Sequence, residues 1–182
     1  MPAISRRRFP FTRFCALLPC AAAFPGTAHA ERLPLKSYTT IDGLPHNGIN
    51  RIVRDSRGFL WFCTEEGLSR FDGYQFTNYG TDQGLPHAAV TDFLETRHGE
   101  LWVATGAGVV RFNPKGAPTQ GIVAADNTPA AVPMFATIVP DDQDRRARYV
   151  NVLREGRDGT IWAGTSKGLY RVERAAQVFS PV

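Results

Sequence analysis

A tryptophan-centred segment occurs three times in this chain, and this repetition is the feature that most limits its fold. The three copies align without gaps and begin DSRGFLW at Asp55, TRHGELW at Thr96 and GRDGTIW at Gly156. All three tryptophans of the chain fall at the same place in these copies. A longer version of the segment, starting GLPH, begins at Gly43 and again 41 residues later at Gly84. A period of about 40 residues indicates one supersecondary unit that is built several times.

Each copy keeps the same residue types at the same distances from its tryptophan. A glycine lies three residues before it, a threonine three after, a second glycine six after and an arginine nine after. We expect each glycine to allow a tight turn through a positive φ. We expect the tryptophan to pack between neighbouring units and the arginine to pair with a carboxylate or carbonyl at the surface; ligand contact is the alternative for both. This repeat signature consists of Gly58, Trp61, Gly67, Arg70, Gly99, Trp102, Gly108, Arg111, Gly159, Trp162, Gly168 and Arg171.

Short runs of apolar, aromatic and β-branched residues separate these turns. In the first unit they predict strands at residues 49–54, 59–64, 68–71 and 74–79. The same reasoning places the three unit cores near residues 49–79, 90–113 and 150–173. Four short antiparallel strands in each period of about 40 residues predict an all-β fold, a partial β-propeller of about three blades.

The GLPH loops and the single cysteine of the repeats are the first places to look for chemistry. Leucine in each loop is expected to anchor it on the core. His46 and His87 are rim candidates for ligand binding because equivalent loops end at one rim, and ordinary polar loop residues are the alternative. Two histidines on separate blades do not make a metal site, so no metal and no cofactor are expected. Cys63 lies on the same strand face as Trp61 and is expected to be a buried apolar residue rather than a catalytic thiol.

A long insertion separates the second and third units. Residues 114–148 contain several prolines and alanines, and within them residues 132–139 are a possible strand. Long insertions on a propeller lie on a loop face, where they are either functional or only tolerated. The mixed charges at residues 141–148 indicate a solvated loop rather than a phosphate-binding patch.

The first thirty residues have the pattern of an export signal. Four arginines precede a moderately apolar run at residues 14–24, and the small residues Ala28 and Ala30 form a signal-peptidase site, so the mature chain would comprise residues 31–182. Twin-arginine export, a lipoprotein site and a cytosolic N-terminus are the alternatives. A periplasmic location is therefore expected.

The charge balance argues against nucleic-acid binding. The whole chain has 21 basic and 17 acidic residues, but four of the arginines belong to the signal, which leaves 17 of each in the mature part. The basic character is therefore a property of the signal, and the main support for a nucleic-acid partner disappears.

The repeats resemble the two-component regulator propeller repeat. The pattern is D-G-L-P followed by D-x-x-G-x-L-W-x-x-T-x-x-G-L-x-R-F-D; residues 42–72 match nearly throughout, residues 84–113 match with Thr96 in place of Asp55, and residues 159–172 match in the core only. The resemblance implies the periplasmic input domain of a hybrid histidine kinase or a diguanylate cyclase, located between a signal peptide and a membrane helix. It also implies an oligosaccharide or another small periplasmic molecule as ligand, and no catalytic residues.

The chain departs from that plan in two respects. It has three units, whereas closed propellers have about four to eight blades, and it carries no membrane helix or output module before Val182. Three expectations follow. The chain is a fragment of a longer receptor that is attached to the membrane downstream, or it associates with further blades or with itself, or it is poorly stable alone. A propeller glycosidase or lyase and an inactive scaffold are the alternative functions. Against an enzyme, no pair of carboxylates recurs at one position of the repeat.

Overall fold

The computed structural model describes residues 34–118, 132–172 and 178–182. Every sheet belongs to Lys36–Val182, the second of the two units into which the chain divides. The predicted signal peptide, with Ala28 and Ala30, lies outside the described residues. No helix in the described ranges is both long and apolar enough to cross a membrane.

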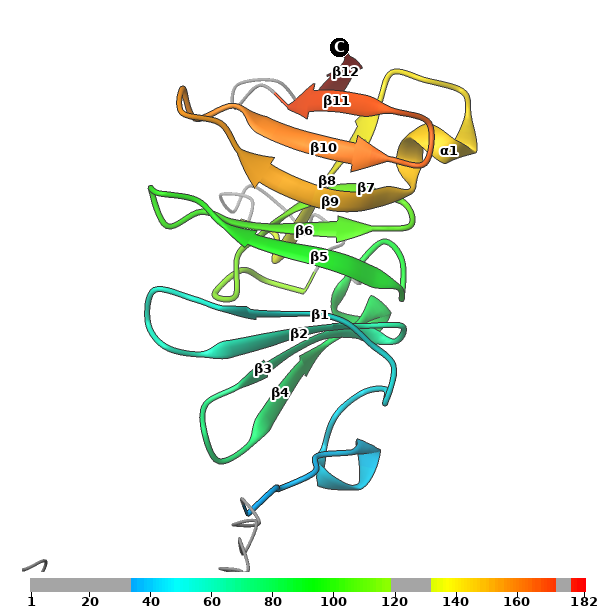
Figure 1. Cartoon of the computed structure of the whole chain (residues 1–182). Helices are drawn as coiled ribbons and strands as arrows, with labels where there is room; N and C mark the ends of the chain where they lie inside the picture. Colours follow the sequence, from blue (N-terminus) through cyan, green and yellow to red (C-terminus); the bar gives the residue numbers. More distant parts are fainter. Residues whose placement is uncertain (1–33, 119–131, 173–177) are drawn as a thin grey trace, which may run out of the picture. The chain divides into compact units, whose positions relative to one another are not determined.

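Three four-stranded antiparallel sheets make up the second unit (Figure 1), which confirms the all-β partial propeller. Strands that follow one another in sequence pair as neighbours within each sheet, and the innermost strands of adjacent sheets contact each other. Short helical turns precede the first, second and third sheets. The elements are η1 (Thr40–Asp42), β1 (Ile49–Arg54), β2 (Leu60–Thr64), β3 (Gly67–Phe71), β4 (Phe76–Tyr79), η2 (Thr81–Gln83), β5 (Val90–Glu95), β6 (Leu101–Thr105), β7 (Gly108–Phe112), β8 (Phe135–Pro140), α1 (Arg145–Arg148), β9 (Val150–Glu155), β10 (Ile161–Thr165), β11 (Leu169–Val172) and β12 (Val178–Pro181).

The second sheet is longer in sequence than its predicted core, residues 90–113. Its fourth strand is β8, which lies inside the predicted insertion and confirms the possible strand there. Phe135 pairs with Phe112 as Phe76 pairs with Phe71 in the first sheet, so the register of the unit is kept. The extra residues therefore separate the third strand from the fourth rather than one blade from the next. In the same way, the third sheet continues past residue 173 to β12, which also pairs in parallel with β8.

The repeated threonine and glycine close the turn between the second and third strands of every sheet, because the threonine hydroxyl donates to the glycine carbonyl. In the first sheet the Thr64 hydroxyl donates to the Gly67 carbonyl at 2.8 Å and accepts from the amide of Glu66. Gly67 has a φ of +125°, and a Cβ there would meet the Tyr79 carbonyl oxygen at 2.7 Å. Glycine is therefore required at this position both by its backbone angle and by the close approach of the fourth strand.

The tryptophans of the first two sheets are buried against the sheet that follows. Trp61 has no exposed surface and stacks on Phe93 of β5 with ring centroids 4.7 Å apart. Trp102 is 2% exposed and belongs to a core cluster with Leu153 and Ile161 of the third sheet. Trp162 of the third sheet is partly exposed. Burying each such side chain stabilises the fold by about 3 kcal/mol.

A small polar cluster attaches the end of the insertion to the third sheet. Asp142 accepts hydrogen bonds from the Lys167 ammonium at 2.5 Å and from the Tyr170 hydroxyl at 2.9 Å. The Lys167 hydrogen bond, the amide of Asp144 and the Tyr170 hydroxyl together lower the pKa of Asp142 from 3.8 to about 2. Nearby, Arg146 pairs with Asp144 as expected for a mixed-charge segment, although residues 145–148 form one helical turn rather than a loop.

This cluster predicts a pH-dependent contribution to stability. Because the folded state lowers the pKa of Asp142, its contribution should be complete above about pH 4 and should disappear as the pH falls toward about 2. The difference in melting temperature between wild type and Asp142→Asn should thus be constant above about pH 5 and shrink below about pH 4. Thermal unfolding followed by circular dichroism across this range measures it. A difference that does not change with pH would contradict the assignment.

Candidate functional site

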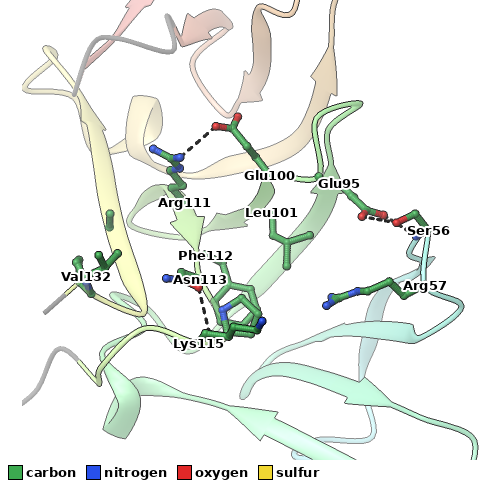
Figure 2. Close-up of a pocket in the computed structure, with 14 residues that line it drawn as sticks. Ser56, Arg57, Glu95, Glu100, Leu101, Arg111, Phe112, Asn113, Lys115 and Val132 are labelled. Carbon is green, nitrogen blue, oxygen red and sulfur yellow. Dashed lines mark hydrogen bonds and ion pairs between the residues drawn. The ribbon is translucent and has the colours of Figure 1, made fainter.

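A pocket of about 740 Å³ lies where the hairpin of the first sheet meets the second sheet (Figure 2). Residues from β5, β6, β7 and β8, and from the segments after β1, β5 and β7, surround it. Its apolar side comes from Leu101, Phe112, Val132 and Pro133, and its polar side from charged residues of both sheets. The full lining is Ser56, Arg57, Glu95, Gly99, Glu100, Leu101, Arg111, Phe112, Asn113, Pro114, Lys115, Val132, Pro133 and Ala136.

The carboxylates of the pocket are already engaged, and its three cations, Arg57, Arg111 and Lys115, are exposed, with Arg57 also paired to Asp55 outside the pocket lining. Glu95 accepts from the amide of Ser56 at 2.6 Å and from its hydroxyl at 2.7 Å, and Glu100 pairs with Arg111 at 3.1 Å. Lys115 is exposed, and the Arg57 side chain is about half exposed. Figure 2 shows these two side chains reaching the same part of the pocket. This arrangement offers positive charge beside an apolar surface, which suits a hydroxyl-rich or acidic ligand.

Asp55 connects the pocket-lining hairpin to the tryptophan of the first sheet. Its carboxylate accepts from the Trp61 indole N–H at 3.0 Å, from the amide of Phe59 at 2.9 Å and from Arg57. Burial raises the pKa of Asp55, but the hydrogen bonds from Trp61, Phe59 and Arg57 outweigh it and hold that pKa below its ordinary value. The carboxylate therefore fixes both the indole and the turn that carries Arg57.

The second sheet lacks this carboxylate. Thr96 occupies the corresponding position, and its hydroxyl accepts only the amide of Glu100 among the hydrogen bonds described. The Trp102 indole N–H is buried and has no hydrogen-bond partner among the described residues. The third sheet has Gly156 there, so the carboxylate–indole bond is a property of the first sheet alone within the part that the structure describes.

Removing the carboxylate at position 55 and introducing one at position 96 test its role. Asp55→Asn keeps the shape but places an amide donor against the indole donor, so the free energy of unfolding should fall by about 1–3 kcal/mol. Thr96→Asp gives the Trp102 indole an acceptor and should raise it by about 1 kcal/mol. Urea denaturation monitored by tryptophan fluorescence measures both. Equal effects of the same sign at the two positions would contradict this account.

The two histidines of the GLPH loops serve the loops themselves. His46 accepts the amide of Gly48 through Nδ1 at 3.0 Å, and His87 accepts the amide of Ala89 through Nδ1 at 3.1 Å. They precede β1 and β5, whereas the pocket lies at the other end of those strands. The structure therefore does not bring them to the pocket. The described residues contain no group of three or more side chains suited to holding a metal ion.

The loop leucines and Cys63 lie in the interior. Leu44 and Leu85 are buried, as the anchoring role requires. Cys63 is fully buried beside Trp61, and burial, together with the charge of Asp92, raises the pKa of its thiol. A thiol in this environment is a packing residue rather than a nucleophile.

The signature arginines lie opposite the tryptophans on the neighbouring strand, but they do not share one contact. Arg70 lies over the ring of Phe59 at 4.7 Å, whereas Arg111 pairs with Glu100. Arg171 is exposed. Only Arg111 reaches the pocket, so the position has no common ligand role in the described structure.

A buried carboxylate that connects all three sheets is absent from the sequence-based candidates. Asp92 of β5 has no exposed side-chain surface and lies 2.7 Å from Arg51 of β1. It also accepts from the amide of Leu153 at 2.9 Å and from Arg154 of β9 at 3.3 Å. No repeat marks this position, because the first and third units have Arg51 and Val152 there. Only the contact between neighbouring sheets reveals it.

Comparison with known proteins shows which family of repeats two segments of the chain match. Residues 43–66 and 84–107 match the family described as two component regulator propeller. The chain carries two-component regulator propeller repeats. Both matched repeats include the GLPH loop, the first hairpin and the tryptophan, so the match covers the inner part of the first two sheets. Histidine kinase P4 of Formosa agariphila is 41% identical over 49 residues, which are 27% of this chain and 4% of that protein.

Solved structures share the fold of these propeller repeats. One, described as the extracellular domain of a hybrid two component system, BT3049 from B. thetaiotaomicron, matches with a TM-score of 0.55 and 21% identity over 75% of this chain and 17% of that chain. Virginiamycin B lyase from Staphylococcus aureus matches with a TM-score of 0.51 and 16% identity, over 72% of this chain and 41% of that one. The chain thus spans a small part of the proteins it resembles, and these likenesses show the fold.

Proposed function

We propose that this chain is a ligand-sensing or interaction propeller of an exported signalling receptor, with its output supplied by another module. The match of residues 43–66 and 84–107 to the two component regulator propeller family carries the proposal. The likeness to an extracellular domain of a two component system supports a location outside the cytoplasm. Binding rather than catalysis is the proposed activity.

The pocket between the first and second sheets is the proposed binding site. Its exposed cations, Lys115 and Arg57, line the same pocket as the apolar residues Val132 and Pro133. A sugar ring presents an apolar face and many hydroxyls, and an acidic sugar adds a carboxylate that these cations can pair with. We therefore favour an oligosaccharide that contains uronic acids over a neutral one.

A lyase shares the fold, and catalysis is the second candidate on that ground. We favour binding because His46 and His87 both use Nδ1 to hold their own loops and lie away from the pocket. The glycan panel used for binding also tests this alternative. Shortened or unsaturated products after incubation with the chain would favour the enzyme.

Isothermal titration with neutral and uronic-acid oligosaccharides tests the binding site. Wild type should bind the acidic set, and Lys115→Glu should weaken that binding about tenfold, or about 1.4 kcal/mol. Arg145→Glu is the matched control, since this exposed arginine lies outside the pocket and reversal of its charge should change affinity little. Equal losses in both variants would indicate unspecific charge attraction, and no binding of either set would contradict the proposed ligand class.

A further inference from the structure

Neighbouring sheets are joined by a contact between a hairpin amide and a glutamate, and this contact occurs twice. The amide of Ser56, in the first hairpin of the first sheet, donates to the carboxylate of Glu95 at the end of β5. The amide of Arg97, at the same position in the second sheet, donates to Glu155 at the end of β9 at 2.8 Å. Each sheet thus offers an amide to a glutamate that ends the first strand of the next sheet.

A second contact occurs at the opposite end of the same strands. The Asn50 side chain of the first sheet donates to the carbonyl of Val90 at 2.9 Å, and the Thr91 hydroxyl of the second sheet donates to the carbonyl of Val150 at 2.5 Å. Val90 and Val150 are the first residues of β5 and β9. The two contacts together fix a sheet at both ends of its first strand.

The third sheet presents the same donors with no sheet beyond them in the described structure. Asn151 takes the place of Asn50 and Thr91, and Arg157 takes the place of Ser56 and Arg97; both are exposed. Register confirms the correspondence, because Val150 pairs with Thr165 as Val90 pairs with Thr105.

The apolar surface of the third sheet is also less buried than that of the first two sheets. Leu68 and Val109, which face the next sheet, have no exposed surface, whereas Leu169 at the same position is 51% exposed. Trp162 is partly exposed where Trp61 and Trp102 are buried. The Asn151 amide also makes a long hydrogen bond to the Ser166 hydroxyl of its own sheet at 3.4 Å and remains exposed. An apolar patch bordered by exposed polar donors is typical of an interaction surface.

We propose that this open face, made of Asn151, Arg157, Trp162 and Leu169, docks a further propeller sheet from outside these 182 residues whose first strand ends in glutamate. The glutamate accepts the amide of Arg157, and the first carbonyl of that strand accepts the Asn151 side chain. The inference concerns the packing of one sheet on the next and is independent of ligand binding in the pocket.

A second copy of this chain fits the face poorly. The first sheet, which would have to follow the third in a head-to-tail assembly, has Arg54 where Glu95 and Glu155 stand. Its guanidinium would meet the amide and side chain of Arg157, so donors would oppose donors and like charges would repel.

The face of the first sheet that a second copy would contact is also partly covered. Tyr38 packs against Phe71 at 5.1 Å and Phe76 at 5.6 Å, much as Tyr79 packs against Phe112 at 4.9 Å between the first and second sheets. A docking copy would have to share this place with Tyr38.

A single charge reversal turns the first sheet into the proposed partner. Arg54 is exposed and forms no ion pair among those described, so Arg54→Glu should fold normally. It supplies the missing glutamate, and the full chain should then associate head to tail through its third sheet. Sedimentation velocity should show a dissociation constant at least about tenfold lower than that of wild type. The comparison is made with Tyr38 present and in the Tyr38→Ala background.

Two controls separate docking from unspecific charge effects. Arg54→Gln removes the positive charge without providing a carboxylate, so it should associate less than Arg54→Glu. Leu169→Glu places a charge on the open face and should abolish the association of Arg54→Glu. Association of wild type as strong as that of the variant would overturn the proposal, because a second copy would then dock without glutamate. Absence of association by Arg54→Glu in both backgrounds would overturn it as well.

Discussion

The burial of the tryptophans of the first and second sheets against the sheet that follows is the constraint on which this structure depends. A four-stranded sheet has apolar side chains on both faces, and the stacking of Trp61 on Phe93 covers one of them. The same arrangement, shifted by one sheet, buries Trp102 against the third. Because each sheet completes the core of its neighbour, the unit is stabilised by succession rather than by any single sheet.

Polar contacts decide how the sheets are aligned once their apolar faces meet. Glu95 and Glu155 hold one end of the first strands, and the carbonyls of Val90 and Val150 hold the other. Asp92 adds a buried carboxylate that reaches the sheets on both sides. The same alignment shapes the pocket, because it places the hairpin that carries Arg57 beside the second sheet.

Sequence reasoning was accurate where the physics is local and incomplete where it depends on neighbouring sheets. Strand β1 has its predicted bounds, and β2, β3 and β4 begin within two residues of theirs, because turn glycines and apolar runs define these strands locally. The role of β8 as a fourth strand was missed because the insertion separates it from its turn signals. The pocket and Asp92 were missed because the residues that meet there come from different sheets; Leu153, for example, is 61 residues from Asp92 in the sequence. The GLPH histidines stood out through repetition, but their repeated function is to hold a loop.

Solvent access to each tryptophan tests the central claim directly. Three variants, each keeping one tryptophan and replacing the other two by phenylalanine, allow acrylamide quenching to be measured at one site at a time. Mutual burial of successive sheets predicts that Trp61 and Trp102 are protected and that Trp162 is readily quenched. Equal quenching of all three in the folded chain would show that the sheets do not cover one another, and would contradict the account.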